Sequence, residues 1–314
     1  SVLQPYRDLV KLFAKDEVIS EDASWIFRIA PYLIFASTLF LAAGVPLFHS
    51  FTFMPSSDLL VFVYTLAFGA FFLALAGLDV GGAFGGFGAS REMMFAALTE
   101  AGLLLSLFAV SILAGTSNIT EMAARLTLPT SSTFLPLLLA ASAFFIALLA
   151  ENARYPVDNP ATHLELTMVH EAMILEYSGK RLALLEWASD CKLLIFIAVF
   201  VNMFMPFGLA GSFAFFTLGA ALAVFLAKSL LVLCGIAFLE SIMAKFRIFR
   251  VPDLLFTSFV LAAIAICIII NSIYIARIKN PLSTYVFNHM AIGIKIFAKI
   301  LPDIINKIFV FPIQ

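Results

Sequence analysis

Acidic and basic side chains interrupt long apolar stretches of this sequence. Glu100 and Lys228 are the deepest, because a rise of about 1.5 Å per residue puts them about 12 and 18 Å inside two predicted helices. Ionisable groups cost several kcal/mol inside a bilayer unless they are paired or hydrated, and when buried they can exchange protons near neutral pH. The two side chains therefore predict a water-filled proton path. Its other predicted members lie nearer the ends of the apolar stretches, and they are Glu92, Glu151, Asp158, Glu165, Lys192 and Glu240.

A purely structural interpretation stays open at several of these positions. Lys192 can carry its charge to the membrane surface by extending its side chain. Glu240 can pair with Lys245 at the end of a helix. Glu100 and Lys228 can form one buried ion pair that holds two helices together without any proton transfer.

The connection from Glu151 to Gly179, ENARYPVDNPATHLELTMVHEAMILEYSG, gathers polar groups between two apolar stretches. His163 and His170 do not have the spacing of a zinc-binding helix, so no metal site is predicted. No Ser/His/Asp or Cys/His arrangement for nucleophilic catalysis is visible, so no catalytic residue is predicted. We expect protonatable groups and contacts to a docked subunit here. The predicted loop and docking residues are Arg91, Arg154, His163, His170, Glu171, Glu176 and Tyr177.

The segment GLDVGGAFGGFGASREMM, residues 77–94, is rich in glycine. A phosphate-binding loop of this composition follows a β-strand, and no strand is predicted before the segment, which disfavours that function. We expect a flexible or tightly turning connection, with Ser90 as the N-cap of the next helix and Glu92 in its first turn. The alternative is that the glycines let two helices approach closely.

The composition is typical of a membrane protein. Hydrophobic residues make up 62% of the 314 residues and charged residues 12%, and the mean hydropathy is +1.05. In soluble domains about a quarter of the residues are charged. The net charge of -1 argues against a nucleic-acid-binding surface. Cys191, Cys234 and Cys267 lie in apolar runs without CxxC spacing, so we interpret them as packing residues.

Seven apolar runs are long enough to cross a membrane as helices, which takes about 20 residues. The predicted fold is an all-α polytopic membrane protein with about seven transmembrane helices, forming a single domain of residues 1–314. Connections with several basic residues alternate with connections that hold only Arg125. By the positive-inside rule, 152–186 is then an acidic loop on the cytoplasmic side. The seven runs are 26–48, 58–78, 92–115, 133–151, 187–209, 212–240 and 253–277.

Two further segments are amphipathic. Residues 1–24 place apolar side chains near helical spacing with basic ones between them, which predicts a helix lying in the membrane interface. Residues 280–314 mix Ile and Phe with Lys, which predicts a second interfacial helix on the outer face.

Several motifs together resemble one family of membrane subunits. The connection 151–179 carries a series of residue types in a fixed order, which is referred to below as the frame. The blocks LQPYRDLVKLFAKDEVI at 3–19 and GASREMMFAALTE at 88–100 point to the same family. They resemble the membrane subunit shared by respiratory complex I, where it is the H subunit or subunit 1, and membrane-bound nickel–iron (NiFe) hydrogenases of the formate hydrogenlyase and hydrogenase-4 type. The frame residues are Glu151, Arg154, Pro156, Asp158, Glu165, Leu166, Glu176, Tyr177, Ser178 and Gly179.

The sequence is similar to the hydrogenase branch of that family in particular. Ala161 and His163 stand where the complex I version carries two more acids, and VDNPATHLELTMVHEAM resembles the hydrogenase-4 form. The family's first span has no counterpart here and would precede Ser1, and the tail after residue 279 has no match.

The resemblance implies a non-catalytic membrane subunit of a respiratory oxidoreductase complex in the cytoplasmic (inner) membrane of a prokaryote. Its partners would be the NiFe hydrogenase large subunit and an iron–sulfur subunit on the cytoplasmic side, antiporter-like membrane subunits and lipid. The Ni–Fe centre and the iron–sulfur clusters would lie in those partner subunits, and this chain would hold no cofactor.

The implied function is to couple electron transfer to proton or sodium movement through an acidic funnel that faces the cytoplasm. In this funnel Arg154 would hold one of the loop carboxylates in place. The alternatives are a complex I subunit with a quinone site, a purely structural anchor and a stand-alone secondary transporter, which is a different class of protein.

Overall fold

The computed structural model describes residues 3–49, 57–126, 131–158, 169–211, 214–243 and 248–279. Contacts between residues divide the chain into two units, Ser1–Cys267 and Ile268–Gln314, and each is described by itself. In the second unit, the described part is the end of the last helix, up to Lys279. The predicted amphipathic tail 280–314 lies outside the described residues.

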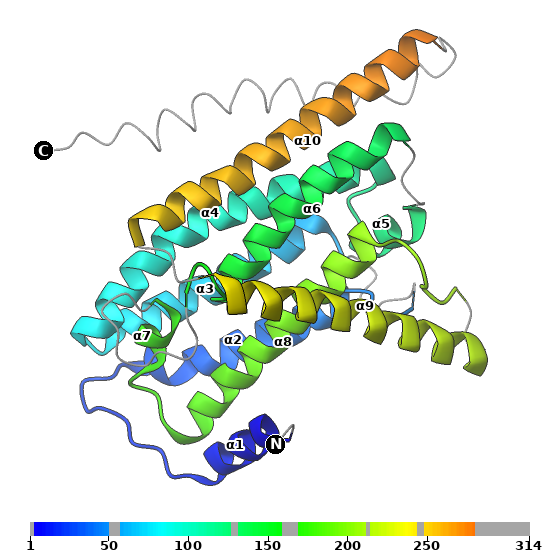
Figure 1. Cartoon of the computed structure of the whole chain (residues 1–314). Helices are drawn as coiled ribbons and strands as arrows, with labels where there is room; N and C mark the ends of the chain where they lie inside the picture. The colour runs from blue at the N-terminus through cyan, green and yellow to red at the C-terminus, as the bar shows by residue number, and fades with distance from the viewer. Residues whose placement is uncertain are drawn as a thin grey trace, which may run out of the picture. The chain divides into compact units, whose positions relative to one another are not determined.

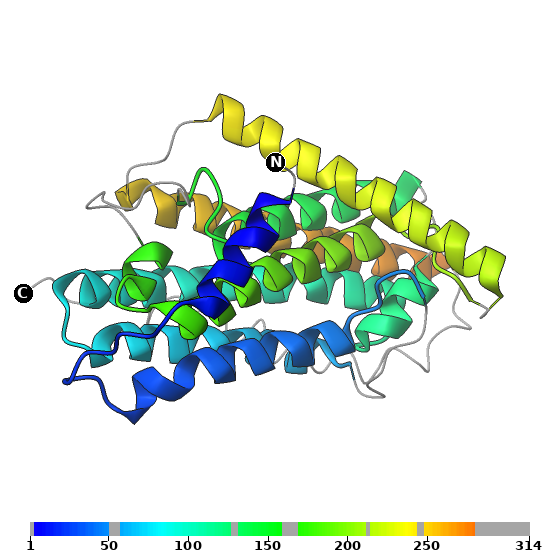
Figure 2. The ribbon, with the colours of Figure 1, turned by 90° about the horizontal axis from the view of Figure 1, so that it is seen from below.

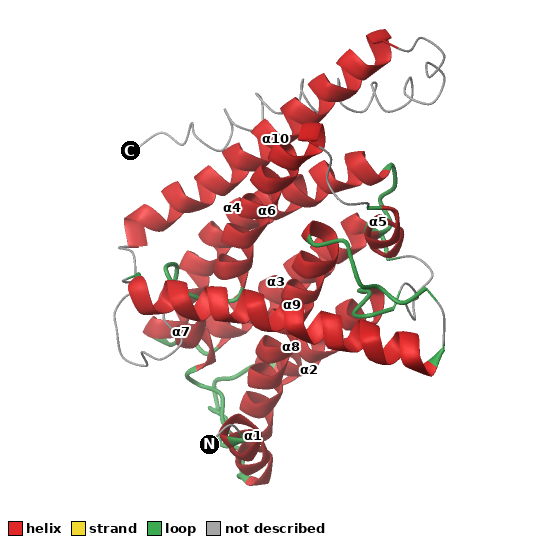
Figure 3. Cartoon of the chain, turned by 45° about the vertical axis from the view of Figure 1, so that its right-hand side comes forward, coloured by secondary structure: helices red, strands yellow, loops and turns green. Residues whose placement is uncertain are grey.

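The regular structure of the described residues is helical, and Figure 3 colours helices and loops but no strand there. The predicted all-α fold is confirmed. The helices are α1 (Gln4–Ala14), α2 (Trp25–Gly44), α3 (Leu59–Asp79), α4 (Ala83–Ala114), α5 (Ile119–Arg125), α6 (Ser131–Glu151), α7 (His170–Ile174), α8 (Gly179–Phe204), α9 (Phe215–Ile242) and α10 (Val251–Lys279), with a 3-10 turn at Ile248–Arg250.

Within the described ranges, six helices are long and apolar enough to cross a membrane, namely α2, α3, α4, α6, α9 and α10. This supports the predicted polytopic membrane protein. The run 187–209 lies largely in α8, which has 26 residues but is not one of the six. The first half of α8 is strongly charged, and it packs against α1, α2, α6 and α9. Its charged residues are Lys180, Arg181, Glu186, Asp190 and Lys192.

Side-chain caps and one glycine determine several helix ends. Ser24, Asp58 and Asn118 accept hydrogen bonds from backbone N–H groups in the first turns of α2, α3 and α5. At the other end of α4, Gly115 has a φ of 70°, a left-handed conformation that favours glycine and ends the helix.

The expected connection at residues 77–94 is wrong in its details. α4 begins at Ala83 after Gly82, so Ser90 lies inside the helix and is not an N-cap. The alternative of close helix approach is confirmed, because a Cβ atom on Gly85 would collide with the backbone carbonyl of Gly77 in α3. A glycine inside a helix costs about 1 kcal/mol relative to alanine. Close packing of α3 on α4 outweighs that cost and keeps the segment helical.

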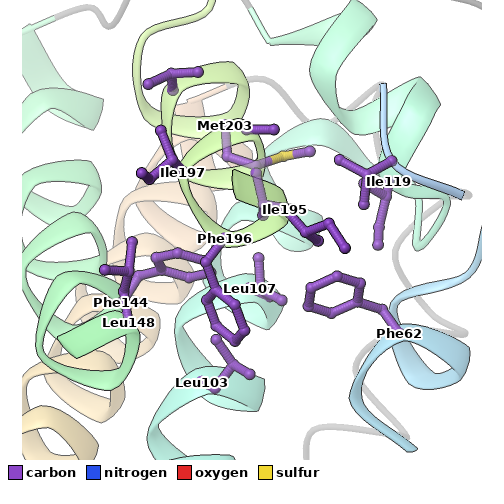
Figure 4. Close-up of a cluster of buried hydrophobic side chains, with 14 of the residues drawn as sticks. Phe62, Leu103, Leu107, Ile119, Phe144, Leu148, Ile195, Phe196, Ile197 and Met203 are labelled. Atoms are coloured by element: carbon purple, nitrogen blue, oxygen red, sulfur yellow. The ribbon is translucent and has the colours of Figure 1, made fainter. Parts of the chain in front are cut away.

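A large buried cluster in the unit Ser1–Cys267 lies between α4, α6 and α8 (Figure 4). Phe144 of α6 and Phe196 of α8 are both 0% exposed, with ring centroids 6.0 Å apart. Leu103 and Leu107 of α4 belong to the same cluster. Figure 1 shows α4 and α6 side by side and α9 crossing α8. Because lipid is as apolar as these side chains, close packing contributes most of the association between such helices.

The helix predicted in residues 1–24 is present as α1, and none of its side chains is buried. It lies across α8 in Figure 2, and the Phe13 ring packs edge to face on the Trp187 ring at a centroid distance of 6.4 Å. Its location in the membrane interface stays a prediction.

Candidate functional site

A cavity of about 670 Å³ lies among α2, α3 and α8, and residues from α4, the end of α6 and α7 also line it. Apolar side chains of α2, α3 and α8 form much of its wall, among them Leu41, Leu66 and Leu185. Four ionisable residues from four different elements also face it. They are Glu92, Glu151, His170 and Lys192.

Glu151 and Lys192 form an ion pair in this cavity. Lys192 Nζ donates to Glu151 Oε2 at 2.7 Å, and the two side chains are 21% and 6% exposed respectively. The Lys192 side chain is therefore directed toward a buried carboxylate. Charge-assisted hydrogen bonds of this length are among the stronger ones in proteins. The pair joins the end of α6 to the middle of α8.

Glu92 and His170 lie in the same wall, but no hydrogen bond joins either side chain to another described residue. Electrostatic interactions connect Glu92 with Lys192, Glu151 and Asp158. The pKa of His170 falls from its ordinary value of 6.5 to about 4, because burial and then the Lys192 charge disfavour the imidazolium, against a smaller opposite effect of Asp158. His170 is therefore neutral at physiological pH.

Asp158 holds the start of α7. Its side chain is buried, and Oδ2 accepts the backbone N–H of Val169 at 3.1 Å and that of His170 at 3.4 Å. With Glu92 and Glu151 it also lines a smaller cavity of about 330 Å³ next to the first. A residue predicted for the proton path thus also positions a histidine.

Among the described residues, Arg154 forms an ion pair with a carboxylate outside the loop. Its Nη1 lies 3.6 Å from Oε1 of Glu240, near the end of α9, with side chains 30% and 26% exposed. This ion pair ties the connection after α6 to α9. Lys245, the predicted partner of Glu240, lies outside the described residues.

The structure does not bring Glu100 and Lys228 together, so the alternative of a buried ion pair between them is wrong. Glu100 lines a separate recess of about 510 Å³ between α3 and α4, within electrostatic reach of Glu151 and Lys192. Lys228 is buried at the end of α8. There its Nζ donates to backbone oxygens of Phe207 at 2.9 Å, Met205 at 3.2 Å and Val201 at 3.4 Å, and to Asn202 Oδ1 at 3.4 Å.

Lys228 therefore does not face the main cavity. Its ammonium group compensates the negative end of the α8 dipole. Its observed contacts are structural.

Tyr177 was predicted as a docking residue, but it is 4% exposed. Its ring stacks on Phe27 with centroids 4.0 Å apart, and its hydroxyl donates to the Phe27 carbonyl at 2.9 Å. A side chain enclosed in this way binds the loop to α2 and is not available to a partner.

The remaining predicted docking residues are dispersed. Glu176 is exposed, Glu171 is partly buried, and the Arg91 guanidinium lies 5.9 Å from the Phe87 ring centroid. His163 and Glu165 fall in residues 159–168, outside the described ranges.

Sequence reasoning missed how the Tyr-Ser-Gly motif holds the segment after α1. Ser178 Oγ accepts the N–H of Val18 at 2.9 Å and donates to the Val18 carbonyl at 3.0 Å. Arg181 pairs with Glu17 and donates to the Arg28 carbonyl. The signal available in the sequence was the conformational freedom of Gly179, whose φ is 58°.

These observations define a class of protein, an all-helical, polytopic membrane protein with a charged cavity among its helices. The family model described as "NADH dehydrogenase" matches residues 1–271. The chain belongs to this family, which is that of complex I subunit 1, the H subunit. The predicted family is confirmed.

The curated relatives support the hydrogenase branch of the resemblance. "Hydrogenase-4 component C" of Escherichia coli (strain K12) is 35% identical over 268 residues, covering 84% of this chain and 83% of the relative. "Formate hydrogenlyase subunit 4" of the same strain is 32% identical over 265 residues, covering 84% and 85%.

A solved structure has a similar fold. It is titled "Structure of the membrane-bound sulfane sulfur reductase (MBS), an archaeal respiratory membrane complex", and the matching chain has a TM-score of 0.74 at 25% identity, covering 86% of this chain and 87% of that one. The relatives belong to multi-subunit membrane complexes, so this chain is a multi-pass membrane subunit with partner subunits.

Proposed function

We propose that this chain is the membrane subunit of a hydrogenase-type redox complex, which it anchors and whose electron transfer it couples to proton or sodium movement. The main support is the wall of the 670 Å³ cavity, where the Glu151–Lys192 ion pair lies with Glu92 and His170. Groups of this kind change their pairing and protonation when a nearby charge changes. A redox module docked over the cavity would supply that change of charge.

The proposed partners are those that the family resemblance implies. A NiFe hydrogenase large subunit and an iron–sulfur subunit would dock on the cytoplasmic side, and antiporter-like subunits would continue the ion path in the cytoplasmic membrane of a prokaryote. The Ni–Fe centre and the iron–sulfur clusters would belong to those partners. The cysteines of this chain are free thiols in α8, α9 and α10, which is consistent with that assignment.

The test uses the assembled complex in sealed vesicles and the Glu151→Gln variant. Dye-linked hydrogenase activity should stay near the wild-type value, while proton or sodium movement per turnover should fall at least about tenfold, because one charge of the cavity is gone. Glu121→Gln is a matched control, since Glu121 forms an exposed ion pair with Arg125 in α5. Wild-type ion movement in Glu151→Gln would contradict coupling through this cavity and favour the purely structural anchor.

A second candidate function, quinone binding, has one observation in its favour. The cavity combines apolar walls with a charged patch, which suits an amphiphilic ligand with a polar head. Quinone-dependent oxidation by the purified complex, inhibited by Leu66→Trp in the cavity wall, would support this alternative. If the complex has no quinone activity and Leu66→Trp has no effect on turnover, the alternative is excluded.

A further inference from the structure

The short helix α7 is seated against α3 and α4 by glycines. A Cβ atom on Gly88 of α4 would lie 2.8 Å from the Val169 carbonyl oxygen and 2.9 Å from Ala172 Cβ. A Cβ atom on Gly77 of α3 would lie 3.1 Å from Met173 Cγ. The distances at Gly88 are too short for a real side chain, so α7 can lie this close to α4 only where residue 88 is glycine. The distance at Gly77 is tight, and a side chain there would require Met173 to shift by a few tenths of an ångström.

The packing of α7 on Gly77 and Gly88, together with Asp158, determines the position of His170. This packing is called the seat of α7 below. The Asp158 carboxylate accepts the N–H groups of Val169 and His170, which fixes the start of α7. His170 then lies in the wall of the large cavity. The backbone therefore positions the imidazole ring, and the ring nitrogens form no hydrogen bond with another described residue.

Ionisable groups from several elements lie near His170. Glu92 of α4, Glu151 at the end of α6 and Lys192 of α8 share the cavity wall with it, Asp158 lies at its backbone, and Glu171 is its neighbour in α7.

Asn152 indicates that the cavity binds water. The residue lines the same wall, and its Oδ1 atom is buried without a hydrogen-bond partner among the described residues. Buried oxygens of this kind are usually satisfied by an ordered water molecule. The cavity offers about 60 Å³ to the centres of water molecules, and one water needs about 10–15 Å³ on that measure, so there is room for several.

We propose that His170 is a proton relay of this cavity, passing protons through cavity water between the Glu151–Lys192 pair and Glu92. The assignment rests on the proposed function and adds to it a specific group. It also changes the role of His170 from a docking residue to a cavity residue.

The relay step is balanced in protons and needs no other reactant. The Lys192 ammonium group gives a proton to a cavity water, which passes one on to the unprotonated ring nitrogen of the neutral imidazole. The other ring nitrogen gives its proton to a second water, which passes one on to the Glu92 carboxylate. The ring ends in its other neutral tautomer. The low pKa of His170 keeps the imidazolium short-lived, so the ring does not retain the proton.

The test compares His170→Gln and His170→Ala in the assembled complex in sealed vesicles, with dye-linked hydrogenase activity measured alongside proton movement. Glutamine keeps a donor and an acceptor but cannot pass a proton through itself. We expect proton movement per turnover to fall at least about tenfold in both variants, with dye-linked activity retained. Added imidazole should restore proton movement in His170→Ala, which has room for it, and not in His170→Gln.

Several outcomes would overturn the relay. Wild-type proton movement in His170→Gln contradicts it directly, even if His170→Ala fails to assemble. A loss in both variants without rescue by imidazole assigns His170 a structural role. If Glu151→Gln abolishes proton movement while His170→Gln does not, the proposed function stands and the relay alone fails. If the wild-type complex moves no ions at all, the proposed function itself fails.

A variant that moves α7 separates the role of the imidazole ring from the role of the packing that positions it. Gly88→Ala removes no ionisable side chain, but it forces α7, and His170 with it, away from α4. It should therefore reduce proton movement as His170→Gln does. Gly86→Ala is the matched control in the same helix, because a Cβ atom there would meet no neighbour within 4 Å. Equal proton movement in the two glycine variants would contradict the argument that the seat positions His170.

Discussion

At the scale of single residues, Glu151 and Lys192 place opposite charges where little water reaches them. Removing one partner leaves the other buried without compensation, so we expect Lys192→Met to lower the free energy of unfolding by about 2–4 kcal/mol. The double variant Glu151→Gln/Lys192→Met should regain most of this loss. The measurement is the thermal unfolding midpoint of the purified complex in detergent.

The exposed pair Glu121–Arg125, with side chains 51% and 56% exposed, provides the comparison. Arg125→Met should change stability by less than about 1 kcal/mol, because water screens exposed charges. A double variant at Glu151 and Lys192 that is no more stable than Lys192→Met would show that the two charges do not compensate each other.

His170 makes stability depend on pH. Its pKa is about 4 in the folded chain and 6.5 ordinarily, so between these values the unfolded chain binds more protons than the folded one. Its contribution is fully present above pH 6.5 and is lost as the pH falls toward 4, at most about 3 kcal/mol.

The measurement is the unfolding midpoint at pH 7.5 and at pH 5 for the wild type and His170→Gln. We expect a smaller decrease in His170→Gln, because glutamine does not titrate. Equal decreases in the two proteins would indicate that His170 titrates near its ordinary pKa.

At the scale of elements, Gly179 connects the loop, the start of α8 and the segment after α1. A Cβ atom there would lie 2.9 Å from Glu17 Cγ, 3.0 Å from the Asp16 carbonyl and 3.1 Å from the Lys15 carbonyl. Gly179→Ala should therefore detach this segment and raise its rate of trypsin cleavage at Lys15 at least about threefold.

Gly81 provides the matched control. Its φ of 68° is as unfavourable for alanine as the 58° of Gly179, but a Cβ atom there would meet nothing within 4 Å. Both variants place alanine in a left-handed conformation, which costs about 1–2 kcal/mol in each. The difference between them therefore measures the effect of the contact. Similar trypsin cleavage in the two variants would mean that this contact does not hold the segment.

The helices were largely predictable from the sequence, but the contacts between their polar residues were not. An apolar run must satisfy its backbone within itself in a bilayer, so its length predicts a helix. The start of α4 was missed because the packing of Gly85 on Gly77 is not visible in local propensity. Depth along a helix also does not tell which way a side chain points, and for this reason Lys228 was assigned to the proton path although it binds the end of α8.

The contacts between the site residues likewise could not be predicted from the sequence. Glu151 and Lys192 were both identified as members of the proton path, but their pairing across 41 residues depends on how α6 packs on α8. His170 was identified as protonatable, while its place in the cavity depends on the glycines of α3 and α4.

At the scale of the molecule, the unit Ser1–Cys267 has two ends of different character. At one end, Ser24 donates its N–H to Asp79, and the Tyr-Ser-Gly motif holds the segment after α1. At the other end, Asn202 donates to the Pro46 and Leu47 carbonyls, and Ser57 donates to Asn118. The charges of the cavity lie nearer the first end, and the positive-inside rule predicts that this end faces the cytoplasm.

This orientation can be measured with single cysteines in a chain whose Cys191, Cys234 and Cys267 are replaced by alanine. Asp22→Cys is exposed at the first end, and Gly211→Cys is exposed at the second, where a Cβ atom meets nothing within 4 Å. A membrane-impermeant maleimide should label Asp22→Cys only in inside-out vesicles and Gly211→Cys only in right-side-out vesicles. The reverse pattern would put the cavity charges toward the outer face, and a redox arm on the cytoplasmic side would then have no direct electrostatic influence on them.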